Sequence, residues 1–323
     1  MYCSSYRLMG QIMGALTLAL VMPAFAQAQS RLPDVTTGGV LKVTPQSATL
    51  LGKITPNGAQ TTYSFQYGTT TLYTAVTPVG TLGAGTTPKD VFADLTGLAP
   101  ATTYHFRLVA RNRNGTVRGA DRVFRTRVQP LGVTFAALPN PVPYERPAVL
   151  GGTLTGTGSG KRQVVLQANP FPFTQGFQAA ANPQLTDPQG RFAFPLLSVP
   201  LTTQYRVVVP GEGQVVSPIV TVGVAVRVAT NTSRRRVRTG GIVRFHGTIR
   251  PARPGAQFAI QNLRRGSWRT VAGGITRGAG GGASRYAKRV RIRRGGQYRV
   301  FVSIVDGNFV SNVGRTVKIS RIF

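Results

Sequence analysis

The sequence predicts an all-β protein made of three tandem β-sandwich domains that follow a cleaved signal peptide. After residue 30, short runs of alternating apolar and polar residues are separated by Gly, Pro, Asn and Thr, and helical periodicity is almost absent. Related segments also recur at a fixed distance, because two QYRV blocks begin at Gln204 and Gln297, 93 residues apart. This spacing is close to the ~100 residues of one β-sandwich.

The first 28 residues have the layout of a secretory signal peptide. Arg7 gives the N-terminal region a positive charge, and residues 12–22 form an apolar run. Two overlapping small-x-small cleavage sites follow, AFA at 24–26 and AQA at 26–28. The only cysteine is Cys3, so the cleaved chain is expected to form no disulfide. No later apolar run approaches the ~18 residues of a membrane helix. We therefore expect a secreted, extracellular or cell-surface/envelope protein with no transmembrane span in the mature chain.

The first expected domain, residues 29–128, contains the most specific stretch of the chain, LTGLAPATTYHFRLVARNRNG at 95–115. Leu98 and Pro100 belong to a turn that precedes a strand beginning at Tyr104. The ring of Tyr104 can be buried while its hydroxyl bonds the upstream backbone. This Leu-x-Pro-x-x-x-Tyr corner resembles that of fibronectin type III modules. The resemblance covers roughly 38–128 and implies a β-sandwich in which the corner opens strand F.

That family usually has a tryptophan in an early strand, and this chain has none there. Leu50 or Leu51 is expected to fill the corresponding core position.

The second and third expected domains, 129–224 and 225–323, are related by an internal repeat. GGTLTGTGSGKRQVVLQ (151–167) aligns with HGTIRPARPGAQFAIQ (246–261), in addition to the QYRV blocks. The segment 259–274, with Trp268, resembles the small immunoglobulin-like repeats of secreted and surface proteins from high-GC bacteria. The resemblance implies two immunoglobulin-like domains. The proline-rich segment 130–147 is expected to be a stiff linker.

Residues suited to catalysis are scarce: the chain has two His and eight carboxylates. His105 and His246 are expected to be solvated strand residues. Asp90 and Asp94 should lie roughly 13 Å apart on one strand face, which exceeds the separation of a glycosidase carboxylate pair. The sequence therefore predicts a non-enzymatic protein with no catalytic residue, no metal site and no cofactor.

Positive charge is concentrated in the last expected domain. The chain has a formal net charge of +31, and residues 225–323 contain 22 basic and 1 acidic residues, whereas 129–224 contain 5 and 3. The fold therefore does not require these arginines. Along 289–293, Val290 and Ile292 should face the core and leave the alternating arginines outside. We predict a polyanion-binding surface to which ten residues contribute: Arg234, Arg235, Arg236, Arg238, Arg264, Arg265, Arg289, Arg291, Arg293 and Arg294.

These features favour a non-catalytic secreted or cell-surface structural and interaction protein. Its basic C-terminal domain would bind an acidic envelope polymer, an anionic lipid or a polysaccharide. Sequence-specific nucleic acid is not expected, because no groove-reading helix is predicted.

Two alternatives stay open. The first is a carbohydrate- or cell-wall-polymer-binding accessory module, for which Tyr63, Phe65 and Tyr67 have the spacing of an aromatic row but are better explained as core. The second is a hydrolase with an unrecognised site.

Overall fold

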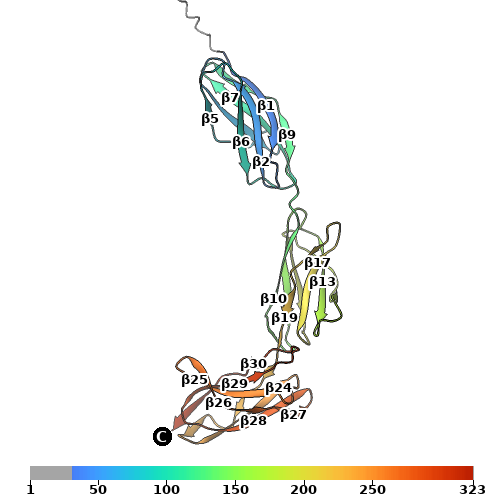
Figure 1. The fold of residues 1–323 in the computed structure, drawn as a ribbon, viewed down its shortest axis with the longest axis vertical. Coiled ribbons are helices and arrows are strands. Elements are labelled where there is room, and N and C mark those ends of the chain that lie inside the picture. Colours follow the sequence, from blue (N-terminus) through green and yellow to red (C-terminus); the bar gives the residue numbers. More distant parts are fainter. Residues whose placement is uncertain (1–30, 323) are drawn as a thin grey trace, which may run out of the picture. The chain divides into compact units, whose positions relative to one another are not determined.

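The computed structural model describes residues 31–322, and in that range it contains strands and turns but no helix (Figure 1). The chain divides into two compact units, one ending at Arg127 and the other beginning at Val128. The all-β class is confirmed, whereas the expected boundaries at 128/129 and 224/225 stay predictions. The expected signal peptide lies outside the described residues.

The first unit is the N-terminal sandwich. One sheet has the order β1-β2-β6, and the other has β4-β3-β7-β8, with β5 also pairing β3 and β9 also pairing β7. The strands are β1 (Asp34–Leu41), β2 (Ser47–Thr55), β3 (Thr61–Gly68), β4 (Ala75–Val76), β5 (Gly80–Leu82), β6 (Lys89–Thr96), β7 (Thr103–Asn112), β8 (Gly115–Arg118) and β9 (Arg122–Arg125).

The core of the N-terminal sandwich follows the two-residue period of its strands. Phe106 and Leu108 of β7 are fully buried and pack with Phe65 of β3. Leu50 is also fully buried, so it rather than the partly exposed Leu51 fills the core position. The inner faces of both sheets thus meet in one apolar layer.

The corner before β7 is held by a tyrosine hydroxyl. The backbone N–H of Ala99 donates a hydrogen bond of 2.9 Å to Tyr104 Oη, and the Tyr104 ring stacks on Phe124 with centroids 5.6 Å apart. Leu98 is buried beside them. This contact and the strand order are typical of immunoglobulin-like and fibronectin type III sandwiches.

The second unit begins with the middle sandwich. Its sheets have the orders β10-β12-β16 and β14-β13-β17-β18, with β15 also pairing β13 and β19 also pairing β17, while β11 pairs β20. The strands are β10 (Gly132–Leu138), β11 (Val142–Pro143), β12 (Ala148–Thr155), β13 (Gln163–Pro170), β14 (Gln178–Ala179), β15 (Gln184–Leu185), β16 (Arg191–Leu196), β17 (Thr203–Val209), β18 (Val215–Val216), β19 (Val220–Val222) and β20 (Val224–Ala225).

The expected linker at 130–147 is wrong. Residues 132–138 form β10, which pairs with β12 from Gly132 opposite Thr155 to Leu138 opposite Val149. Phe135 of β10 also stacks on Phe192. The prolines that suggested a linker end the strand, since proline cannot donate to a sheet ladder.

The same unit ends with the C-terminal sandwich. One sheet has the order β21-β24-β28-β27, with β22 also pairing β24, and the other has β23-β31-β29-β25-β26, with β30 also pairing β29. The strands are β21 (Arg227–Val228), β22 (Asn231–Thr232), β23 (Arg236–Arg238), β24 (Ile242–Arg250), β25 (Gln257–Arg264), β26 (Ser267–Ile275), β27 (Arg277–Gly280), β28 (Ala283–Arg291), β29 (Gly296–Ser303), β30 (Asn312–Val313) and β31 (Val317–Ile322).

The middle and C-terminal sandwiches share a hydrogen-bonded junction inside the second unit. The backbone N–H of Val310 donates to the carbonyl of Val224 at 2.7 Å, and that of Val226 donates to the carbonyl of Val310 at 3.2 Å. Tyr144 and Phe309 meet edge to face beside these bonds, with centroids 5.9 Å apart. Buried backbone groups at the junction are therefore paired rather than left unsatisfied.

A glycine in the second long strand of the middle and C-terminal sandwiches allows the preceding backbone to approach closely. A Cβ atom at Gly152 would lie 1.8 Å from the carbonyl oxygen of Thr134, and one at Gly247 would lie 1.8 Å from that of Ala229. No side chain fits at these two points without moving the backbone. The contact differs in the N-terminal sandwich, where a Cβ atom at Gly52 would lie 3.2 Å from the carbonyl oxygen of Thr36 and would meet the end of the Leu108 side chain first.

Replacing Tyr104 by Phe should lower the unfolding free energy of the N-terminal unit by about 1 kcal/mol, because the hydrogen bond to Ala99 is lost while the ring stays packed. Calorimetry of the full chain would measure this as a lower melting temperature for that unit. Tyr63→Phe is the matched control, since the Tyr63 hydroxyl makes no hydrogen bond within 31–322. Equal shifts in both variants would contradict a role for the corner hydroxyl.

Candidate functional site

The ten arginines of the predicted polyanion surface lie in three segments of the C-terminal sandwich. Arg234–Arg238 precede and form β23, Arg264 and Arg265 lie at the turn after β25, and the other four lie in β28 and the turn after it. All ten side chains are exposed. Val290 and Ile292 are buried between the exposed arginines, so the alternation expected for this strand is confirmed.

Five of the ten arginines line one cavity of about 430 Å³. It lies between β26, which contributes residues 270–272, and β28, which contributes residues 289–291. The five are Arg264, Arg289, Arg291, Arg293 and Arg294. Folding thus gathers side chains that are as many as 30 positions apart in the sequence, from Arg264 to Arg294.

Three hydrogen bonds hold the Arg264 side chain and the Arg294 backbone beside this cavity. Arg264 Nε donates to Asn262 Oδ1 at 3.1 Å, and the buried Asn262 in turn donates to the carbonyl of Gln297 at 3.0 Å. The Tyr298 hydroxyl donates to the carbonyl of Arg294 at 2.7 Å. Burial raises the pKa of Tyr298, against the opposing effect of the Arg264 charge, so this hydroxyl keeps its proton and holds the turn.

A second cavity of about 450 Å³ continues along the same two strands. It is lined by residues 274–275 of β26 and 285–288 of β28, together with Arg244 and Arg277. Tyr286 forms part of its floor and donates a hydrogen bond of 2.8 Å to the carbonyl of Ala229. Burial raises the pKa of Tyr286 to about 12. We call the two cavities together the β26–β28 groove.

The remaining predicted arginines do not line this groove. Arg235 and Arg236 line a separate cavity of about 250 Å³ together with Arg315 and Lys318. This cavity lies beside β23 and β31. β23 and β26 are the two edge strands of the same sheet, at its opposite ends. The structure therefore divides the predicted surface between two sheet edges, whereas the sequence suggested one surface.

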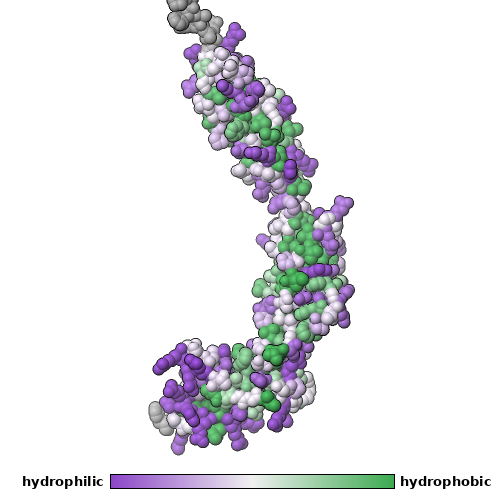
Figure 2. Space-filling model, in the orientation of Figure 1, coloured by the Kyte–Doolittle hydropathy of each residue, from purple (hydrophilic) through white to green (hydrophobic). Residues whose placement is uncertain are grey.

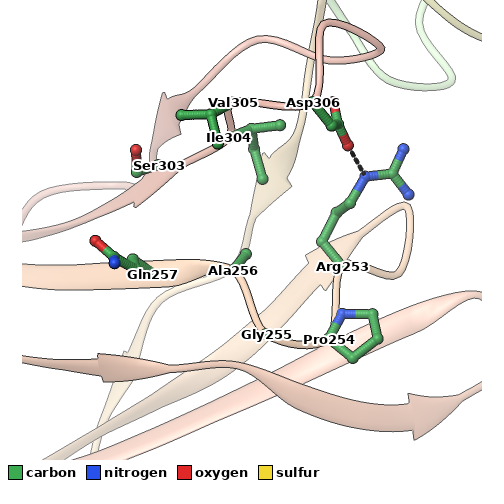
Figure 3. A pocket seen from close by; sticks show the side chains of 9 residues that line it. All are labelled: Arg253, Pro254, Gly255, Ala256, Gln257, Ser303, Ile304, Val305 and Asp306. Atoms are coloured by element: carbon green, nitrogen blue, oxygen red, sulfur yellow. Dashed lines mark ion pairs between the residues drawn. The ribbon is translucent and has the colours of Figure 1, made fainter.

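The single acidic side chain of residues 225–323, Asp306, does not line the groove. Figure 3 shows it paired with Arg253 beside another pocket. Asp306 Oδ2 is 3.0 Å from Arg253 Nε and forms an ion pair with it. Asp306 Oδ1 accepts backbone hydrogen bonds from Asn308 and Phe309, and the Arg253 guanidinium lies 4.1 Å from the Phe309 ring centroid. Asp306 thus orders its own loop and pairs with Arg253. No carboxylate lines the groove among the described residues.

Figure 2 shows strongly hydrophilic residues gathered over the C-terminal sandwich on the face in view. Strands β24, β26 and β28 of this sandwich carry exposed arginines. Nine cationic side chains line the groove itself, so their mutual repulsion is relieved only by counterions or by an acidic partner.

The N-terminal sandwich contains a charged cluster that the sequence did not reveal. His105 Nδ1 lies 2.8 Å from Asp121 Oδ2, and the Tyr73 hydroxyl donates to Asp121 Oδ1 at 2.7 Å. Partial desolvation raises the pKa of Asp121, but hydrogen bonds from Tyr73 and His105 and the charge of Arg107 outweigh it, so this pKa is lowered. Asp121 lies 16 residues after His105, and only the pairing of β7 with β9 brings them together.

The other residues considered for catalysis have separate partners. Asp90 is 3.4 Å from Lys53 Nζ, and Asp94 accepts a hydrogen bond of 2.6 Å from Thr49. His246 is half-buried, and its Nδ1 has no hydrogen-bond partner within the described chain. Residues 31–322 contain no group of three His, Cys, Asp or Glu side chains that could hold a metal ion.

Each sandwich contains the same contact on the outer face of its larger sheet. An arginine Nε donates a hydrogen bond of 2.8 Å to a glutamine on the neighbouring strand, and the guanidinium lies over an aromatic ring at 4.2–4.3 Å from its centroid. The three sets are Arg107, Gln66 and Tyr73, then Arg206, Gln167 and Phe177, and finally Arg299, Gln261 and Trp268. One face of each ring is therefore covered by a cation.

No family model matches the chain, and neither does any curated protein. Among solved structures, it is similar to the sensor domain of the anti-sigma factor RsgI4 of Pseudobacteroides cellulosolvens, with 22% identity over 29% of this chain and 94% of that chain and a TM-score of 0.25. It is similar to the FN1-FN3 domains of chicken CNTN1, with 14% identity over 91% and 100% and a TM-score of 0.28. It is also similar to domains A168-A170 of titin, with 11% identity over 90% and 99% and a TM-score of 0.38. Because all three TM-scores are below 0.5, the fold assignment rests on the strand order and core of this chain.

Replacing Arg299 by Ala should uncover Trp268 and remove the hydrogen bond to Gln261. We expect the unfolding free energy of the C-terminal sandwich to fall by about 1–2 kcal/mol and the emission of Trp268, the only tryptophan, to shift to longer wavelength. Arg269→Ala, at an exposed position of β26, is the control and should change neither. An unchanged emission maximum in Arg299→Ala would show that the stacked contact is absent in solution.

The lowered pKa of Asp121 should make the N-terminal unit sensitive to acid. Its ionised carboxylate contributes stability that is present above about pH 4 and is lost as the pH falls through the folded-state value. The difference in melting temperature between wild type and Asp121→Asn should therefore shrink between pH 6 and pH 3. Asp34→Asn, at an exposed position with no ion pair among the described residues, should show no such trend. A constant difference for Asp121→Asn would be the contrary result.

Proposed function

We propose that this chain is a non-catalytic structural and interaction protein, exported to the cell surface or beyond, that binds acidic envelope polymers through its C-terminal sandwich. One observation carries the proposal: the β26–β28 groove gathers nine cationic side chains and no carboxylate. Guanidinium groups suit phosphate and carboxylate groups because they can donate two parallel hydrogen bonds.

The middle sandwich supports this interpretation, since it has related strands without the charge. Its strand β16 corresponds to β28, and it contains one basic residue, Arg191. The arginines of β28 are therefore an addition to the scaffold. Because unrelieved repulsion destabilises a compact domain, an acidic partner gives them a physical role.

Export is supported by the signal-peptide pattern of residues 1–28. Within 31–322 no helix is long and apolar enough to cross a membrane.

The carbohydrate-binding alternative has less support than polyanion binding. Phe65 is fully buried, and Tyr63 and Tyr67 pack against the same core, so they do not present an aromatic row. Sugar rings usually need an open aromatic face, whereas Tyr73, Phe177 and Trp268 each have one face covered by arginine.

Replacing Arg289, Arg291 and Arg293 by Gln should weaken binding of the full chain to purified envelope and to DNA, which serves as a model polyanion. Removing about three phosphate contacts should make the negative slope of log K against log salt shallower by about 2–3. The matched control is Arg118→Gln, Arg122→Gln and Arg125→Gln in the N-terminal unit, which removes the same charge. If control and test variants bind equally weakly, the groove is not the binding site.

A further inference from the structure

The outer edge of β28 is unpaired along most of its length. β24 pairs with β28 from Ser284 to Arg291, but on the other side β27 pairs only with residues 283–285. The chain passes from β26 in one sheet to β27 in the other at Thr276, so β27 does not extend beside the rest of β28. A strand position therefore stays vacant next to residues 286–291, and the β26–β28 groove runs along it.

The backbone of β28 presents hydrogen-bonding groups to this vacant position. Just after β28, Ile292 N–H donates to Gly241, and Ile292 accepts from Gly240 N–H, both at 2.9 Å, on the β24 side. Backbone groups alternate between the two edges of a strand, so Ala287, Arg289 and Arg291 direct their N–H and C=O groups outward. All three are exposed. These groups form the template on which an added strand pairs.

The corresponding edges of the other two sandwiches differ from β28. Strand β16 carries Pro195, which cannot donate a hydrogen bond and blocks pairing at an edge. Strand β6 carries acidic Asp90 and Asp94 beside Lys89. β28 has no proline, and all its charged side chains are positive. Only this edge therefore combines an unblocked backbone with charge of one sign.

We propose that β28 accepts an extended acidic segment of another protein as an added β-strand. Strand addition supplies affinity through backbone hydrogen bonds and specificity through alternate side chains. Acidic residues opposite Arg289 and Arg291 would form cross-strand ion pairs on the outer face. The residue between them would enter the groove beside Val290 and Val271, which are among its lining residues.

A second copy of this chain does not fit the same position. Two β28 edges would place like charges opposite each other, which is unfavourable. The chain has eight acidic residues in all, dispersed along its length, so none of its own segments supplies an acidic strand. The occupant is therefore a different protein.

This inference does not depend on polymer binding, because the two require different chemistry. Binding of a polyanion requires only positive charge on the protein. Binding of an added strand also requires free backbone N–H and C=O groups along one edge of the bound segment. N-methylation removes a backbone donor and leaves the charge unchanged, so it separates the two.

The test uses the full chain and three peptides of the sequence Glu-Val-Glu-Val-Glu-Val-Glu at physiological salt. One peptide is unmodified, one is N-methylated at its three valines, and one is N-methylated at its second, third and fourth glutamates. Isothermal titration calorimetry should show binding of the unmodified peptide and at least tenfold weaker binding of one methylated peptide. The other methylated peptide should bind within about twofold, because an added strand pairs along one edge only.

Arg289→Gln with Arg291→Gln should weaken binding of the unmodified peptide at least tenfold, whereas Arg118→Gln with Arg122→Gln should leave it unchanged. Equal affinity of all three peptides, or no binding of any, would overturn strand addition. DNA binding is measured in parallel, so that failure of the peptides with retained DNA binding rejects this inference alone and leaves the polymer proposal standing.

Discussion

The arginine–glutamine hydrogen bond on each larger sheet joins the two central strands on which each sandwich is built. In the C-terminal sandwich it links β29 to β25 through Arg299 and Gln261, which lie directly opposite each other. A shift of one residue between these strands would turn Val300 and Ile260 out of the core. The contact therefore supports the register on which the core depends, and the same holds for β3 with β7 and for β13 with β17.

This arrangement also explains why the candidate binding surface lies at a sheet edge. The outer faces of the larger sheets are occupied by arginine side chains that cover the aromatic rings. Among the cations of the β26–β28 groove, only Arg264 has a side-chain hydrogen-bond partner among the described residues, namely Asn262. Asp306, the one carboxylate of this sandwich, is engaged with Arg253. Cations there stay available, next to backbone groups that are also unpaired. The unpaired cations and the unpaired backbone groups of β28 therefore lie together at the β26–β28 groove.

Much of the fold could be predicted from local patterns. The two-residue period placed Phe106, Leu108 and Val290 in the core, and the aligned segments identified two related sandwiches. This period does not determine which strands are neighbours in a sheet. The sequence therefore predicted a linker at 130–147, although part of this segment pairs with β12. For the same reason it could not predict the contact between Asp121 and His105.

The sequence predicted only part of the candidate site, because it does not determine which strands are neighbours. Arginine density located the basic sandwich, but it could not separate the arginines beside β23 from those beside β28, which lie at opposite edges of the sandwich. The vacant edge of β28 depends on the short length of β27 and on the crossing at Thr276. The four glycines at 278 and 280–282 permit the turn between β27 and β28, where residues 280–282 have positive φ, but they do not indicate that a neighbouring strand is absent.

The near absence of carboxylates from the C-terminal sandwich has a consequence for how its attraction to partners is regulated. Guanidinium groups keep their proton at every physiological pH, and Asp306 is the single acid in 225–323. The charge of this domain is therefore carried almost entirely by guanidinium groups. The C-terminal sandwich would keep its positive charge as its surroundings acidify, so ionic strength and the ionisation state of a bound partner would control when that partner dissociates.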